Sequence, residues 1–259
     1  MSRTLDWLLI GGIAGGAYWY WRRERRDEGS RVDGDARHAR HAYSPPSPLT
    51  PTADVEVDAP PAKASAITRR FDDLFRQHGQ RIPVPYLRAL AHAESGMNPN
   101  DALGLINVVP VALADFNRRH PEATVAPSQM REPANNIRVA ADTLRTIIAS
   151  YERNHGDIKN LRENWQNPRF VELASFGWNA GFSERAGVGR VVRALKDRKV
   201  PAADVTIDAV FRAAPGIAGV AEHLSNPRKL AYSKGVAATF FHERSRDGRE
   251  RVATAPAVA

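Results

Sequence analysis

Apolar residues recur at intervals of three and four over most of the chain after residue 65, which is the spacing of one helix face. The clearest case covers residues 136–155 and ends before Gly156. Shorter helices are predicted at residues 67–78, 85–95, 111–120, 169–178, 188–196, 207–213 and 228–241. No strand pair is evident, although a small hairpin near residues 105–109 is an alternative. The pattern predicts a mainly α domain over residues 66–243.

The start of the chain follows a different pattern. Residues 5–21 are apolar apart from Asp6. As a helix they would be about 26 Å long, slightly short of a bilayer core of roughly 30 Å. Trp7 at one end and the aromatic residues 18–21 at the other resemble membrane-interface belts. We expect a retained transmembrane anchor over residues 1–22, in contact with a lipid bilayer. A cleaved signal peptide is the competing interpretation.

The anchor also carries glycine pairs. Gly11 and Gly15 are four residues apart, a spacing that allows close helix contact in a membrane, and it predicts a homodimer. Residues 23–65 are charged and then rich in proline, with few large apolar side chains, so we expect a disordered linker. Residues 244–259 are charged and then rich in alanine and proline, which predicts a disordered tail.

Composition narrows the function classes. The chain is 42% apolar and 25% charged, which is ordinary for a globular protein. Its formal net charge of +8 indicates a basic surface that suits an anionic polymer or lipid. No nucleic-acid motif accompanies the charge, so we expect no specific nucleic-acid partner. The absence of cysteine excludes disulfides and thiolate metal sites.

Glu94 is the candidate catalytic residue. It follows Leu87 by seven residues and Leu90 by four, which places it on the core-facing side of a helix that ends near Gly96. A carboxyl there loses solvation, and its pKa should rise. A raised pKa is what a general acid needs near neutral pH. From spacing alone, a Glu that frays in solvent at a helix end is the alternative.

Four short motifs follow one another in a recognisable order. They are ESGMNP at residues 94–99, GLINVVP at 104–110, NNI at 135–137 and WNAG at 178–181. Together they resemble the E-S-x-F-N-P, G-L-M-Q-x-x-P, N-I and Y-N-A-G motifs of the soluble lytic transglycosylase family, over about residues 67–241. The resemblance implies a lysozyme-like helical catalytic domain that cleaves the glycan strands of peptidoglycan.

The chain departs from this family pattern at three places. Asn107 stands where the family has Gln, and Trp178 stands where it has Tyr. The loop between Pro99 and Gly104 is shorter than in the family, and it has no counterpart of the family's Ser near the substrate's N-acetyl group. These departures favour a degenerate site, whereas the intact context of Glu94 favours an enzyme.

The resemblance implies a single-carboxylate mechanism. Glu94 would protonate the glycosidic oxygen and then accept the proton of the muramic C6 hydroxyl, which attacks C1 to give a 1,6-anhydro sugar. The implied chemistry needs no metal and no cofactor. The implied substrate-binding residues are Ser95, Asn107, Trp178, Asn179 and Tyr232.

Among them, Asn107 would hold the N-acetyl group or a nearby sugar oxygen. Trp178 would stack on a sugar but would lose the hydroxyl with which the family's Tyr could bond Glu94. Tyr232 resembles the family's late Tyr, whose hydroxyl reaches the active site. Asn179 would shape the loop under the substrate.

Two alternatives to a transglycosylase stay open: a lysozyme-type muramidase that uses water, and a glycan-binding or structural membrane protein with a degenerate site. The setting is also open. Residues 22–26 are arginines except Glu24, and the positive-inside rule would keep this flank cytoplasmic, away from peptidoglycan. The internal membrane of a virion removes this conflict. A bacterial inner membrane with the domain facing the periplasm is the other setting.

Overall fold

The computed structural model describes residues 67–254. In this range the chain forms α-helices joined by turns and short 3-10 segments, and no strand. The helices are α2 (Asp72–His78), α3 (Val84–Ser95), α4 (Pro110–Arg119), α5 (Pro133–His155), α6 (Pro168–Ala180), α7 (Val188–Asp197), α8 (Ile207–Ala213) and α9 (Pro227–Thr254). The mainly α prediction is therefore confirmed for this part of the chain, and the alternative of a hairpin at residues 105–109 is wrong.

The predicted anchor at residues 1–22 and the predicted linker at residues 23–65 lie outside the described residues. Of the helices that are described, none is long and apolar enough to cross a bilayer.

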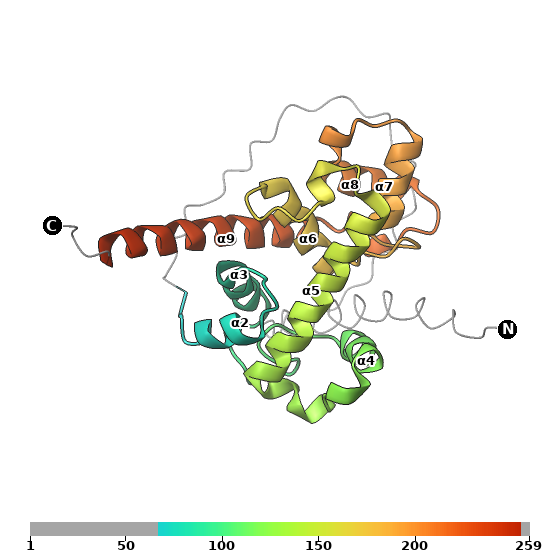
Figure 1. Cartoon of the computed structure of the whole chain (residues 1–259). Helices are drawn as coiled ribbons and strands as arrows, with labels where there is room; N and C mark the ends of the chain where they lie inside the picture. The colour runs from blue at the N-terminus through green and yellow to red at the C-terminus, as the bar shows by residue number, and fades with distance from the viewer. Residues whose placement is uncertain (1–66, 255–259) are drawn as a thin grey trace, which may run out of the picture.

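Helix α5 is the central helix of the domain, with α2 and α4 beside its first half and α7 near its last turns (Figure 1). It begins at Pro133, where a missing N–H is tolerated, and its inward stripe includes the buried residues Leu144 and Ile147. Helix α9 packs along both α3 and α6. The site described below is built where these three helices meet.

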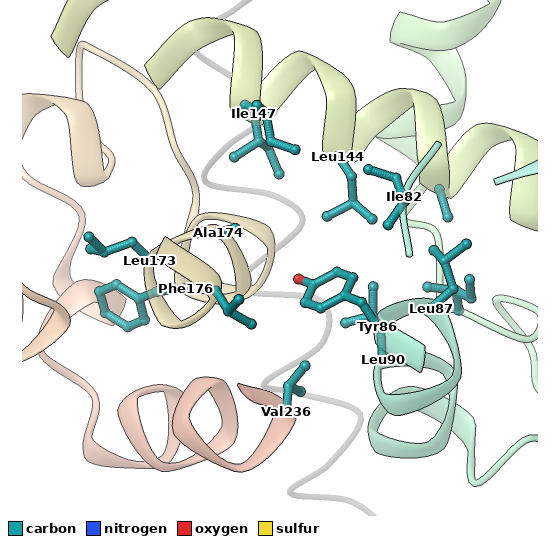
Figure 2. Packing of buried hydrophobic residues seen from close by; sticks show 14 of the residues in the cluster. Ile82, Tyr86, Leu87, Leu90, Leu144, Ile147, Leu173, Ala174, Phe176 and Val236 are labelled. Atoms are coloured by element: carbon teal, nitrogen blue, oxygen red, sulfur yellow. The ribbon is translucent and has the colours of Figure 1, made fainter. Parts of the chain in front are cut away.

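The core lies between α3, α5, α6 and α9. In Figure 2, Tyr86 of α3 extends across the core toward α6, with Leu144 of α5 above it and Val236 of α9 below. The hydroxyl of Tyr86 lies 3.1 Å from Ser175 Oγ of α6, so its only polar atom is hydrogen-bonded inside the core. Burial of these side chains fixes the relative positions of the four helices.

The end of α9 differs from the prediction. A disordered tail was expected from residue 244, but α9 continues to Thr254, so that prediction is wrong for residues 244–254. The reason is that charged residues of this segment have buried partners. Arg246 pairs with Glu243, which is only 1% exposed, and Asp247 forms ion pairs with Arg69 and with the buried Arg88.

Arg88 is the centre of this ion cluster. Its guanidinium, 1% exposed, contacts Asp72 of α2 at 2.6 Å, Glu243 of α9 at 2.7 Å and Asp247 of α9 at 3.3 Å. Burial opposes charge, but the three carboxylates keep the pKa of Arg88 above its usual value. The cluster therefore ties α2, α3 and α9 together through groups that have lost their water.

Arg88→Met should destabilise the domain by about 3–5 kcal/mol, because Asp72 and Glu243 would stay buried without their cation. Urea unfolding followed by circular dichroism would measure the loss. Arg118→Met is the control, since Arg118 is 67% exposed and its pairing with Asp115 is worth at most about 1 kcal/mol. Equal effects from the two substitutions would contradict the assigned role of Arg88.

Candidate active site

The carboxyl of Glu94 is where three helices converge. Glu94 is the penultimate residue of α3 (Val84–Ser95). Its Oε1 accepts a hydrogen bond from Trp178 Nε1 of α6 at 2.8 Å and another from the Tyr232 hydroxyl of α9 at 2.5 Å. The structure thus brings together Glu94, Trp178 and Tyr232. The alternative of a Glu that frays in solvent is wrong.

The chain turns sharply after Glu94. Gly96 ends α3 in the left-handed conformation, with φ of +66°, and its N–H donates to carbonyls of the last turn. Ser95 Oγ donates to the Leu105 carbonyl at 2.7 Å and accepts from the Asn98 N–H at 3.0 Å. Ser95 therefore holds the returning loop against the end of α3. Its role in binding substrate stays a prediction.

The side chain of Asn136 holds the same loop through hydrogen bonds to its backbone. It is fully buried on α5, its Oδ1 accepts from the Ile106 N–H at 2.8 Å, and its Nδ2 donates to the Leu103 carbonyl at 2.9 Å. Gly104 has φ of +81°, and a Cβ there would lie 2.2 Å from Asn136 Nδ2. A glycine is thus required for the loop to close over Asn136.

Asn107 ends this loop beside Glu94. It adopts a left-handed conformation, with φ of +42°, and its Nδ2 donates to the Glu94 carbonyl at 2.5 Å. Its Oδ1 is buried and has no hydrogen-bond partner among the described residues. In this structure Asn107 holds the end of α3, and its predicted contact with a sugar stays a prediction.

Burial raises the pKa of Glu94 above its usual value. The hydrogen bonds from Tyr232, Trp178 and Asn107 and the positive charge of Lys229 lower it, but burial prevails. The expectation of a raised pKa is confirmed. The carboxyl therefore keeps its proton to higher pH than a solvated Glu does. The neighbouring donors are placed to stabilise its ionised form.

Trp178 replaces the family's Tyr without loss of the polar contact. The sequence suggested that a hydroxyl able to bond Glu94 would be missing, but the indole N–H supplies the hydrogen bond instead. Trp178 is half-buried and packs against the core. Stacking of a sugar on its ring stays a prediction.

Lys229 was missed by the sequence analysis. It is 3% exposed, and its Nζ donates to the Asn179 carbonyl and, at 3.3 Å, to Asn179 Oδ1. The signal was present, because Lys229 precedes Tyr232 by three residues and so shares its helix face. Asn179 contacts this lysine in the structure, and its predicted part in shaping the substrate loop stays a prediction.

The two other acids near the motif have ordinary roles. Asp101 Oδ1 accepts weakly from the Leu103 N–H in its own turn, at 3.5 Å. Asp115 pairs with Arg118 and Arg119 on the surface of α4. Within residues 67–254, no group of three or more His, Cys, Asp or Glu residues is arranged to hold a metal ion.

Tyr232→Phe should move the protonation midpoint of Glu94 to higher pH, because the carboxylate loses a donor while the ring is kept. A pH titration of the Glu94 carboxyl carbon by NMR would measure the shift. Tyr151→Phe is the matched control, since the Tyr151 hydroxyl bonds the Leu173 carbonyl instead of Glu94. A midpoint that moves to lower pH in Tyr232→Phe would contradict the prediction.

We compared the chain with known protein families. Residues 75–200 match the transglycosylase SLT domain, a range that includes Glu94, Asn107 and Trp178. Neither a search of curated proteins nor a search of solved structures gave a match. The helical fold and the enclosed carboxyl at the end of α3 agree with the family match. Residues 75–200 are therefore a transglycosylase SLT domain, and the members of that domain family are lytic transglycosylases that act on peptidoglycan.

Proposed function

We propose that Glu94 alone serves as acid and then as base in cleaving the β-1,4 bond between MurNAc and GlcNAc. The observation that supports this most strongly is the environment of its carboxyl. Burial raises the pKa of Glu94, which favours the protonated acid, and the donors from Trp178 and Tyr232 stabilise the carboxylate that follows. One residue is thereby suited to both halves of the reaction.

In the first half, the Glu94 proton passes to the glycosidic oxygen and the bond from C1 to that oxygen breaks. In the second half, the carboxylate takes the proton of the muramic C6 hydroxyl, and O6 forms the new bond to C1. The hydrogen bonds from Trp178 and Tyr232 both end on Oε1, so Oε2 is the oxygen that would carry the proton. The product is a 1,6-anhydro sugar, and no water is consumed.

Around the carboxyl, we assign the substrate contacts to Ser95, Asn107, Trp178, Asn179 and Tyr232. Trp178 offers an aromatic face for sugar stacking, and Asn107 and Ser95 carry the loop that would border the sugar. A muramidase that uses water, or a glycan-binding protein with a degenerate site, remains the competing function.

Glu94→Gln should lower the cleavage of purified sacculi by a factor on the order of 10² or more, because the amide can neither give nor accept the catalytic proton. Turbidity loss would report the rate. The digest made by the unsubstituted protein in oxygen-18 water, analysed by mass spectrometry, should contain anhydro ends without label.

Glu122→Gln supplies the control, because the same chemical change is made at a side chain that is 71% exposed. Circular dichroism would verify that both variants are folded. Labelled reducing ends would show a hydrolase, and undiminished activity of Glu94→Gln would exclude Glu94 as the acid.

We further propose that the enzyme is held in a membrane and opens the cell wall locally during genome delivery by a virus particle. Three features of the sequence support this setting: the apolar residues 5–21, the arginines that follow, and the proline-rich residues 23–65. At ~3.1 Å per extended residue, such a linker would reach on the order of 100 Å from the bilayer. A bacterial inner membrane with the domain in the periplasm is the competing location.

Zymography of purified, lipid-containing virions should show a lytic band at the mass of the chain, 28.6 kDa. Membranes of uninfected host cells serve as the control and should lack it. A band in the host membranes and none in the virions would place the protein in the bacterium.

A further inference from the structure

We propose that Lys229 is a positioning residue whose buried ammonium group caps the end of α6 and stabilises the ionised form of Glu94. This inference rests on the proposed role of Glu94 as acid and base. Nothing in the family motifs assigns a function to Lys229, which lies beyond the matched residues 75–200.

The geometry joins Lys229 to both donors of the site. It lies in the first turn of α9, one helix turn before Tyr232, and Tyr232 donates to Glu94. Its Nζ donates to Asn179, the residue after Trp178, and Trp178 also donates to Glu94. A substitution at Lys229 would therefore disturb the positions of Tyr232 and Trp178, which both donate to the carboxyl of Glu94.

The contact with Asn179 also has a reason in helix physics. The last carbonyls of a helix lack partners within the helix and carry partial negative charge. At the end of α6, the Asn179 carbonyl accepts from Lys229, and the Ala180 carbonyl lies 2.8 Å from His223 Nε2. Lys229 and His223 thus cap the helix end that carries Trp178.

The charge of Lys229 acts on Glu94 as well. Burial lowers the pKa of Lys229 to about 8, and the negative charge of Glu94 opposes this shift. In return, the positive charge of Lys229 lowers the pKa of Glu94. Other titratable groups act on this pair. Tyr86 interacts with the charge of Glu94, and His223 has its pKa lowered by burial and by Lys229, whereas Glu222 raises the pKa of His223.

These effects give Lys229 a task in the reaction. Burial alone would favour a permanently protonated Glu94, which could act as an acid but would be slow to become a carboxylate. A nearby cation in a site of low dielectric limits that rise. Since the two groups interact, they titrate as a pair, and each should shift the midpoint of the other.

The test uses the full-length chain with two neutral replacements. Lys229→Met removes the charge and the donor, and Lys229→Gln removes only the charge. In both variants the NMR midpoint of the Glu94 carboxyl should move to higher pH, and the pH optimum on soluble peptidoglycan strands should follow it. We expect kcat at neutral pH to fall by on the order of tenfold, because Glu94 must ionise without a neighbouring cation, with KM nearly unchanged.

Lys234→Met is the matched control, since Lys234 lies on the same helix but is 43% exposed and pairs with Asp208. It should leave the midpoint where it was. A folded Lys229→Gln variant that titrates like the unsubstituted protein would overturn the inference. A rise in KM without a shift of the Glu94 midpoint would also overturn it, because a buried lysine does not touch the substrate.

A reciprocal measurement does not depend on replacing Lys229. In Glu94→Gln, the midpoint of the Lys229 ammonium, followed through its nitrogen shift, should move to lower pH. An unchanged midpoint would overturn the inference on its own. If Glu94→Gln retains full activity, the proposed function fails. If Glu94→Gln is inactive and the unsubstituted protein gives the anhydro product, but Lys229 and Glu94 titrate independently, only this inference fails.

Discussion

The ion cluster around Arg88 is the constraint on which the active site depends. Glu94 lies on α3, whereas Tyr232 and Lys229 lie on α9, so the site exists only while these two helices keep one relative position. The buried guanidinium fixes that position, because sliding of α9 would separate Glu243 and Asp247 from it. Such a cluster contributes more to specificity of arrangement than to net stability, since desolvation offsets much of its attraction.

At Glu94 two opposing effects are balanced. Burial raises the pKa of Glu94, and the donors and the cation around it lower the pKa without reversing the shift. A solvated Glu would already be ionised near neutral pH, and a buried Glu without donors would be reluctant to ionise at all. The surroundings place the carboxyl between these limits, which is the state that an acid required to become a base needs.

Helical periodicity was sufficient to predict the helices, because buried residues such as those of α5 repeat with helical spacing. The family motifs were sufficient to place Glu94, Trp178 and Tyr232 at one site, although Glu94 and Tyr232 are 138 residues apart. The prediction of a disordered tail failed because it depended on contacts between residues that are far apart in the sequence. In the sequence, residues 244–254 resemble a solvated tail, because the partner of Asp247 is Arg88, far away in the chain.

Lys229 was overlooked for the same reason. It stands beside Arg228 and near Lys234, and such a run of charges usually forms a solvated helix face. Only packing against α6 shows that one member of the run is buried. The role of Asn107 was likewise beyond a sequence pattern, since its amide turns back to the Glu94 carbonyl as a consequence of its positive φ.

The pair of Glu94 and Lys229 also links function to stability. The pKa of Glu94 is raised in the folded state, so folding retains its proton more firmly, and the stability owed to this group falls as pH rises from its unfolded pKa to its folded pKa. For Lys229 the folded pKa is lowered to about 8 from 10.5, so the stability owed to it is lowest below that range and recovers as pH rises through it. Where both groups are ionised, each charge opposes folding, and each reduces the penalty of the other. A site that kept only one of them would lose this compensation, which is a physical reason for a buried cation to accompany the partly buried carboxyl that we propose as the catalytic acid.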